Sequence, residues 1–276
     1  MKIRKPAVAG RFYPGTKKEI IKQLNEIMKQ EQDKIDYPLG NANIIGGIVP
    51  HAGYMFSAYQ AVHFYEILKQ SEQKFDTFII INPNHTGYGE GISIDSHDEW
   101  ETPLGDVEVD TEFRSLTNFT VSSEAHQFEH SGEVQVPMLQ HFLSNKFQIL
   151  PITMSVQDIE NARTIAKTIF TVNKQLGKNI CILASSDFSH FMKPEEGRKL
   201  DRLVINEILG LNALGVQKEV KGKNISVCGF GPIMTLIEYS KLVSGTPKAI
   251  ELKVGNSGEI IPSNEVVGYA SMIFTY

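Results

Sequence analysis

The chain has 276 residues, of which 41% are hydrophobic, and this content is enough for a sizeable buried core. The formal net charge is −5 and the 27 basic residues are scattered, which argues against a nucleic-acid binder and against binding to an anionic membrane surface. No stretch approaches the run of about 18 apolar residues that a membrane span needs. The start lacks the long apolar segment of a secretory signal, and the two cysteines, Cys181 and Cys228, are too few for a disulfide framework, so we expect a cytoplasmic globular protein.

The first half of the chain alternates helical and strand patterns. Residues 16–30 carry apolar side chains at helical spacing, with Thr16 as the N-cap candidate, and residues 44–49 form an apolar run typical of a buried strand. A helix over 57–69 and a second buried strand over 75–81 follow. Residues 91–110 alternate with period two around the turn sequence TPLG, which predicts a β-hairpin.

The second half continues the alternation without an internal repeat or a linker. The pattern predicts helices over 134–143, 156–173, 198–214 and 232–242, and strands over 147–154, 179–184, 225–228, 249–258 and 266–276. Buried runs that alternate with amphipathic helices are typical of an α/β fold. We therefore expect one domain, residues 1–276, with a central mixed β-sheet that is flanked by helices on both faces.

Chemically active side chains follow the predicted strands at the points where they end. His51 and His85 come just after the first and second strands, Asp187 and His190 follow residues 179–184, and Cys228 ends the apolar run at 225–228. In open α/β sheets, ligands bind in the crevice beyond the carboxyl ends of the strands. Imidazole and thiolate ligands, completed by a carboxylate or water, suit Fe, Cu or Zn. The sequence therefore indicates a metal site in that crevice.

Each candidate also has a purely structural interpretation. A lone histidine is more often a hydrogen-bonded structural residue than a ligand, and this is our interpretation of His63, His97, His126 and His141. In the loop sequence EHSGE, Glu129 and His130 are either additional metal ligands or, with Glu133, a capping and ion-pair cluster. Asp187 either takes part in acid–base chemistry beside His190 or holds a loop by accepting backbone N–H groups.

Seven segments of the chain resemble, in order, the signatures of the MEMO family, which is named for a mediator of receptor-driven cell motility. They run from residue 5 to about residue 232 and read KPAVAGRFYP, VPHAGYMFS, NPNHTG, TPLGDVEVD, EHSGEVQVPML, ASSDFSHF and CGFGPI. This family is similar in fold to class III extradiol dioxygenases of the LigB type, which hold non-haem Fe(II) with two His and one Glu and use a further His as acid–base catalyst.

The resemblance implies a role for each matching position. His51 and His85 would be the two histidine ligands, and His190 would be the acid–base catalyst, with Asp187 orienting its imidazole. Cys228 stands where the dioxygenases have their Glu. A thiolate is softer than a carboxylate and shifts the metal preference from Fe(II) toward Cu or Zn.

Members of the family are described as Fe or Cu proteins with redox activity and, elsewhere, as binders of phosphotyrosine peptides. The resemblance therefore implies a metal-dependent redox or dioxygenase-like activity on an unidentified small molecule, for which an aromatic compound is one candidate. Prokaryotic members have genes that often neighbour those of an AMMECR-type protein and a radical SAM protein, which implies possible partners. Two alternatives are a non-catalytic binding module that uses the same pocket for a peptide or tyrosine-like ligand, and zinc-dependent hydrolysis at a His/His/Cys site.

Overall fold

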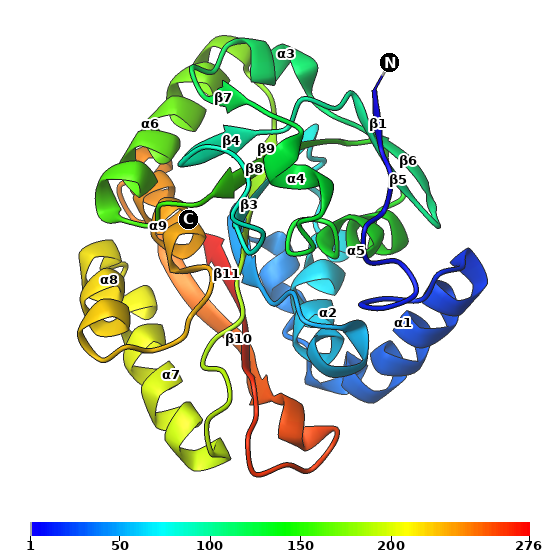
Figure 1. Ribbon diagram of the computed structural model, residues 1–276, viewed down its shortest axis with the longest axis vertical. Coiled ribbons are helices and arrows are strands. Elements are labelled where there is room, and N and C mark those ends of the chain that lie inside the picture. Colours follow the sequence, from blue (N-terminus) through cyan, green and yellow to red (C-terminus); the bar gives the residue numbers. More distant parts are fainter. Residues whose placement is uncertain (1) are drawn as a thin grey trace.

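The computed structural model describes residues 2–276 and shows a central sheet between two layers of helices (Figure 1). The sheet has eight strands in the order β10-β11-β2-β9-β3-β8-β4-β7. Strands β2, β9, β3 and β8 are parallel neighbours, whereas β11 pairs antiparallel with β2 and β10, and β4 pairs antiparallel with β8. The expected mixed α/β sheet is therefore confirmed. Its strands are β2 (Ile44–Val49), β3 (Thr77–Pro83), β4 (Ile92–Ile94), β7 (Thr120–Val121), β8 (Gln148–Met154), β9 (Ile180–Ser185), β10 (Lys248–Asn256) and β11 (Gly268–Thr275).

Helices cover both faces of this sheet and bury a separate apolar core on each (Figure 1). One core joins the sheet to α1 (Lys17–Glu31), α2 (Tyr54–Gln70) and α5 (Gln135–Phe142). The other joins it to α6 (Ile159–Leu176), α7 (Pro194–Leu209), α8 (Ala213–Gly222) and α9 (Phe230–Val243). This double cover explains why the four central strands, β2, β9, β3 and β8, are almost continuously apolar. Short helices are α3 (Thr111–Ser115), α4 (Glu124–Gln127), η1 (Gln32–Lys34), η2 (Tyr37–Asn41) and η3 (Ser257–Glu259).

Helix α2 packs unusually close to strand β2. All six residues of β2 are buried, and a Cβ atom at Gly47 would lie 2.2 Å from the ring of Phe64 on α2. Only glycine leaves room for that ring, so the sequence of β2 sets the distance between helix and sheet. The segment that joins the two elements, residues 50–53, contains His51 and is short enough to hold it at the end of the strand.

The expected hairpin over residues 91–110 was wrong in its first half. Strand β4 joins the large sheet beside β8, because Ile94 belongs to the core on the α6 face. The hairpin forms instead between β5 (Glu99–Thr102) and β6 (Gly105–Glu108), around the TPLG turn, where Gly105 has a φ of 122°. With β1 (Ile3–Arg4) these two strands make a separate three-stranded sheet.

Two other element predictions were wrong. The helix expected over 198–214 is two helices, α7 and α8, separated at Leu211, whose left-handed φ of 53° ends the first one, while the Asn212 side chain caps the second. The strand expected over 225–228 is a loop, because its polar groups bond to the segment after β9 and not to a strand ladder. Among residues 2–276, no helix combines the length and the apolar character that crossing a bilayer requires.

Candidate metal centre

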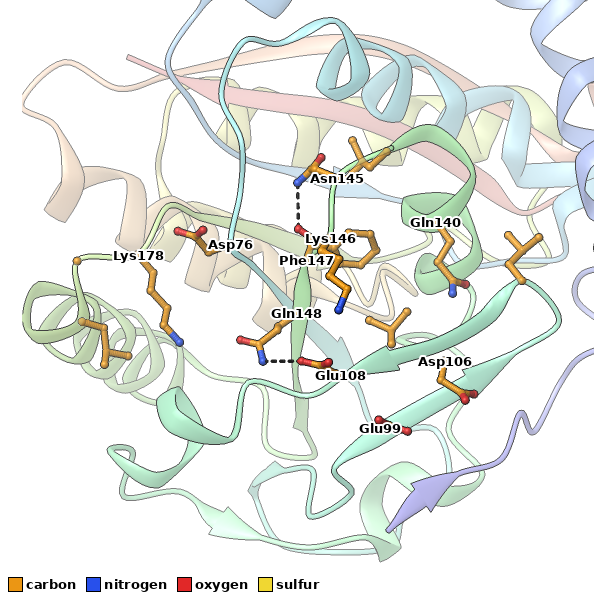
Figure 2. A pocket seen from close by; sticks show the side chains of 15 residues that line it. Asp76, Glu99, Asp106, Glu108, Gln140, Asn145, Lys146, Phe147, Gln148 and Lys178 are labelled. Atoms are coloured by element: carbon orange, nitrogen blue, oxygen red, sulfur yellow. Dashed lines mark hydrogen bonds between the residues drawn. The ribbon is translucent and has the colours of Figure 1, made fainter. Parts of the chain in front are cut away.

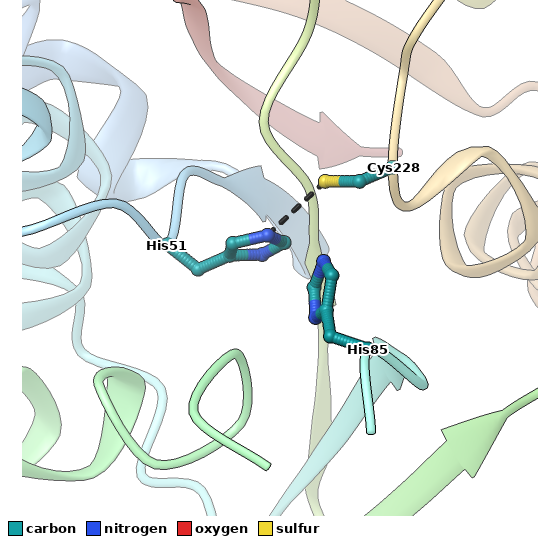
Figure 3. A group of neighbouring side chains, drawn as sticks. All are labelled: His51, His85 and Cys228. Atoms are coloured by element: carbon teal, nitrogen blue, oxygen red, sulfur yellow. Dashed lines mark hydrogen bonds between the residues drawn. The ribbon is translucent and has the colours of Figure 1, made fainter. Parts of the chain in front are cut away.

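Three side chains from distant segments converge beyond the carboxyl ends of β2 and β3 (Figure 3). His51 follows β2, His85 follows β3, and Cys228 lies in the loop before α9. One ligand atom of each lies within 4.8 Å of the others, and Cys228 Sγ is 3.1 Å from His51 Nε2. Because β9 lies between β2 and β3 in the sheet, the residues that follow it, Asp187 and His190, border this cluster.

Ser185 holds the ring of His51 from behind. Its Oγ lies 3.0 Å from His51 Nδ1, donates its single proton to the carbonyl of Ser131 at 2.7 Å, and accepts from Gln135 Nε2 at 2.9 Å. With its proton used, the hydroxyl can only accept from the imidazole, so Nδ1 carries the hydrogen. The lone pair of His51 Nε2 therefore points at Cys228.

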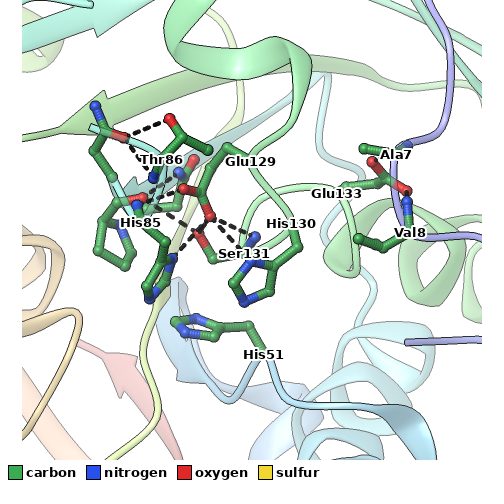
Figure 4. A network of polar contacts seen from close by, with 12 residues as sticks. Ala7, Val8, His51, His85, Thr86, Glu129, His130, Ser131 and Glu133 are labelled. Carbon is green, nitrogen blue, oxygen red and sulfur yellow. Dashed lines mark hydrogen bonds and ion pairs between the residues drawn. The ribbon is translucent and has the colours of Figure 1, made fainter. Parts of the chain in front are cut away.

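Glu129 holds His85 in the same way (Figure 4). The backbone N–H and the Nδ1 of His85 lie 2.6 and 2.9 Å from the two carboxylate oxygens, and Ser131 donates its N–H and its hydroxyl to Oε1. Burial alone would raise the pKa of Glu129, but the hydrogen bonds from His85 and Ser131 lower it to about 2. Glu129 is therefore an ionised carboxylate that orients His85 and leaves its Nε2 free, a common arrangement behind metal-binding histidines.

His130 completes a triangle of imidazoles. Its ring centroid lies 4.6 Å from that of His85, 5.5 Å from that of His51 and 4.6 Å from that of Phe12. Its Nδ1 is 3.5 Å from Glu129 Oε1, and one of its nitrogens lies within 4.8 Å of ligand atoms of His85 and Glu129. Burial lowers the pKa of His130 to about 4, so the ring is neutral at neutral pH. His130 thus lines the cluster as a neutral group.

Asp187 supports the cluster from the other side. Its Oδ1 accepts the backbone N–H of His51 at 2.7 Å, and its own N–H donates to Cys228 Sγ at 3.2 Å. Burial raises the pKa of Asp187 to about 6 in spite of these backbone hydrogen bonds. The Asp187 carboxylate accepts a backbone N–H in the turn after β2, whereas Nδ1 of the His190 ring lies against the carbonyl of Ser226.

The His51 and Cys228 side chains are both neutral before a cation binds. Burial lowers the pKa of His51 well below its usual value, and the neighbouring imidazoles lower it further. Burial, followed by the charge of Asp187, raises the pKa of the Cys228 thiol. The thiol therefore donates to His51 Nε2, and a cation that binds between them must displace that proton.

Gly229 lets the Cys228 loop lie directly against the end of β9. A Cβ atom at this position would lie 2.3 Å from the carbonyl oxygen of Ser185 and 2.6 Å from Cβ of Ser186. The Gly229 N–H donates to Ser186 Oγ at 3.0 Å. A larger residue would push the loop, and the sulfur with it, away from His51.

Sequence reasoning missed the polar residues behind the ligands. Ser185, Ser131 and Gln135 orient His51 and His85, and Ser226 contacts His190. Serines near strand ends are common in loops, so their residue type alone did not mark them. The one available signal was position, since Ser185 is the last residue of β9, two residues before Asp187.

A groove lies at the opposite end of the central strands (Figure 2). This groove of about 800 Å³ is bordered by Asp76, Gln148 and Lys178, which lie at the amino ends of β3, β8 and β9. Lys178 is already paired with Asp110 and Glu112 at 2.9 Å each. The groove is therefore separate from the histidine cluster, which lies at the carboxyl ends of the same strands.

A family model described as Memo-like protein matches residues 4–273. The chain belongs to the MEMO family. Among curated proteins, a MEMO1 family protein of Methanosarcina barkeri is 39% identical over 98% of this chain and 99% of its own length. MEMO1 family proteins of Archaeoglobus fulgidus and Methanocaldococcus jannaschii are 37% and 39% identical, each over 99% of both chains. The resemblance found in the seven sequence segments is thereby confirmed.

The MEMO fold also resembles that of a more distant protein. The crystal structure of an uncharacterized protein from Escherichia coli K12 aligns with a TM-score of 0.55, over 84% of this chain and 99% of that one. The two sequences are 9% identical, so the likeness concerns the fold alone.

Proposed function

We propose that this MEMO family chain binds a redox metal, Fe or Cu, through His51, His85 and Cys228 and performs a dioxygenase-like oxidation of an aromatic or other small molecule. The observation that carries the proposal is the convergence of two imidazoles and a thiol within 4.8 Å, with Cys228 Sγ 3.1 Å from His51 Nε2. Both Nδ1 atoms are held by partners inside the protein, so both Nε2 atoms are available to a ligand.

The donor set fits such an ion. Metal bonds to imidazole nitrogen and thiolate sulfur of about 2.0 and 2.3 Å place tetrahedral ligand atoms roughly 3.3–3.8 Å apart. The 3.1 Å separation of Cys228 Sγ and His51 Nε2 needs only a small expansion to reach this range. Nitrogen with thiolate sulfur suits copper and zinc as well as iron, and we rank zinc below the two redox metals.

The residues of the chain then have distinct tasks. A bound Fe or Cu would supply redox chemistry and open coordination positions. The Asp187 N–H bond to Cys228 Sγ favours the thiolate that binding requires. His190 would accept the proton of a substrate hydroxyl at Nε2, since its Nδ1 faces a carbonyl. The neutral His130 and the Phe12 ring would form an uncharged aromatic wall beside the substrate.

Metal analysis tests this proposal. Protein purified without chelators is expected to contain close to one Fe or Cu per chain, and His51→Ala and His85→Ala are each expected to lose it. His141→Ala is the matched control, because His141 lies on α5 and contacts Phe142 rather than the cluster. Equal metal content in all four proteins would refute the assignment.

A second candidate function is a binding module without catalysis. The observation in its favour is that the carboxylates beside the cluster are engaged: Glu129 with His85 and Ser131, and Asp187 with the His51 backbone. The carboxylate ligand of the dioxygenase pattern is then replaced by the Cys228 sulfur, which would alter O₂ activation while keeping a pocket.

Oxygen uptake separates the two functions. Fe(II)-reconstituted protein is mixed with catechol or protocatechuate, and O₂ consumption is followed for the native chain and for His190→Ala. Uptake that disappears in the variant supports catalysis. Metal-loaded protein that consumes no O₂ with either compound, yet binds them reversibly, supports the binding module.

A further inference from the structure

His190 is held at two points by one residue that the sequence did not mark. Its backbone N–H donates to Ser226 Oγ at 2.7 Å, and its Nδ1 lies 2.8 Å from the Ser226 carbonyl oxygen. A carbonyl can only accept, so the hydrogen of the neutral imidazole must sit on Nδ1. The other nitrogen, Nε2, is then an acceptor.

Ser226 belongs to the same loop as Cys228. Three contacts run antiparallel between this loop and the segment after β9, joining Gly229 to Ser186, Cys228 to Asp187, and Ser226 to His190. The loop therefore places a candidate metal ligand and the partner of His190 only two residues apart. Only one residue, the buried Val227, separates Cys228 from Ser226, so a displacement of Cys228 would also displace Ser226.

The chain around His190 is constrained on its other side as well. Ser189 donates its N–H and its hydroxyl to the two oxygens of Asp201, at 2.9 and 3.0 Å. Phe191 adopts a left-handed φ of 56°, which non-glycine residues rarely adopt, and the next residue, Met192, exchanges two backbone hydrogen bonds with Val266. The backbone of His190 is thus held between Ser189 and Met192, and Ser226 is the residue that also contacts its ring.

We propose that Ser226 is the positioning residue of His190: its hydroxyl fixes the backbone, and its carbonyl fixes the tautomer that leaves Nε2 as proton acceptor. This inference rests on the proposed function, which assigns proton transfer to His190. It adds that the loop carrying Cys228 also sets the direction in which His190 can accept a proton.

The tautomer is measured directly by long-range ¹H–¹⁵N correlation spectra of protein labelled at histidine nitrogen. The protein is kept metal-free with EDTA at a pH of about 8.5, where an ordinary imidazole is neutral, and His190 signals are assigned by their loss in His190→Gln. We expect the native His190 to show one protonated nitrogen, Nδ1, and one unprotonated nitrogen, Nε2, with widely separated shifts.

Variants of Ser226 then test the cause. Ser226→Ala is expected to move the two His190 nitrogen shifts toward each other, because the released ring mixes both tautomers, and Ser226→Thr is expected to restore them by returning the hydroxyl. Ser240→Ala is the control, because Ser240 is a buried serine that bonds to Ile237 on α9. Its His190 spectrum should match the native one.

Two results would overturn the inference: an Nε2-protonated or mixed tautomer in the native protein, or a Ser226→Ala spectrum identical to the native one. The native spectrum decides the tautomer even if Ser226→Ala does not fold. Because these spectra use metal-free protein, they are independent of metal analysis. If the proposed function is wrong, the protein contains no metal but His190 still has its hydrogen on Nδ1. If this inference is wrong, the protein binds metal but His190 has the other tautomer or a mixture of both.

Discussion

Three imidazoles near the ends of the central strands are each held at Nδ1, and each by a different kind of acceptor. Nδ1 of His51 faces a hydroxyl, Nδ1 of His85 faces a carboxylate, and Nδ1 of His190 faces a backbone carbonyl. Each acceptor selects the tautomer with the hydrogen on Nδ1 and leaves Nε2 unprotonated. The chemistry of the site is therefore specified as much by the residues behind the rings as by the rings themselves.

Glu129 is the support whose loss should be easiest to measure. Glu129→Gln removes the charge that orients His85 and replaces one acceptor oxygen by an NH₂ donor, so the dissociation constant for added Cu or Fe(II) is expected to rise about 10- to 100-fold. Isothermal titration calorimetry measures it. Glu124→Gln, an exposed glutamate five positions earlier, is the control. Equal dissociation constants for the two variants would show that Glu129 does not support the ligand.

Asp201 makes stability depend on pH. Burial raises its pKa to about 6, above the ordinary value of about 3.9. The folded protein therefore binds the proton more tightly than the unfolded chain, and the stabilisation present below about pH 4 is lost as the pH rises through about 6. Asp201→Asn removes this titration and keeps an acceptor for the Ser189 N–H.

Urea unfolding at pH 4.5 and pH 7.5 checks the sign. The unfolding free energy of Asp201→Asn, relative to the native protein, is expected to increase by about 2 kcal/mol between these conditions. Other titrating groups are common to both proteins and cancel in the difference. A difference that stays constant with pH would contradict the raised pKa.

Among single residues, strand-end position was the informative signal. His51 and His85 were singled out because each follows an apolar run that is a strand, and Cys228 because it ends an apolar run that proved to be a loop; the structure brings these three together. Ser226 and Gln135 could not be found in this way, because their roles depend on contacts with segments 36 and 50 or more positions away. Such contacts leave no local pattern in a single sequence.

At the scale of elements, long apolar segments were predicted well and short or interrupted ones were not. Strands β2, β3, β8 and β9 are buried on both faces, so their runs are almost continuously apolar. β1 and β7 have two residues each, too few to show a period. The break between α7 and α8 was hidden because apolar residues on both sides of Leu211 stay in helical phase.

A buried ion pair fastens β1 to the start of α5. Arg4 and Glu133 are each 1% exposed and 2.7 Å apart, and Glu133 also accepts from the Ala7 and Val8 N–H groups and from Tyr13. Glu133→Gln leaves the Arg4 charge buried without a counterion, so the unfolding free energy is expected to fall by about 3 kcal/mol or more.

The neighbouring pair Lys5 and Glu101 provides a matched control. Its side chains are 69% and 37% exposed, so solvent screens the attraction and Glu101→Gln should leave the urea midpoint unchanged. Each variant removes the carboxylate of one ion pair, and the basic partners, Arg4 and Lys5, are adjacent in the chain. Equal losses in the two proteins would show that burial of the Arg4 pair has no energetic role.

At the scale of the whole molecule, the cluster joins parts of the chain that are far apart in sequence. His51 and Cys228 are separated by 177 positions, and His85 comes from a third segment. A metal bound by all three would therefore cross-link the turn after β2, the turn after β3 and the loop before α9. Because the unfolded chain cannot present these ligands together, binding should stabilise the folded state.

Thermal unfolding measures this stabilisation. With Cu or anaerobic Fe(II) at about 100 times its dissociation constant, the folded state gains about 2.7 kcal/mol, and Tm is expected to rise by several degrees. EDTA should reverse the rise, and His51→Ala should not show it. A rise of the same size in His51→Ala would place the stabilising metal elsewhere on the protein.

The order of strands also has a consequence for synthesis on the ribosome. β2 is made early, yet its neighbour on one side, β11, is made after every other element. Until residues 268–275 emerge, that edge of β2 has its N–H and C=O groups unpaired, and such an edge can join strands of other chains. When Cys228 has left the ribosome, this last strand is still missing. A chaperone that covers the open edge of β2 would therefore protect a chain in which all three candidate ligands are already present.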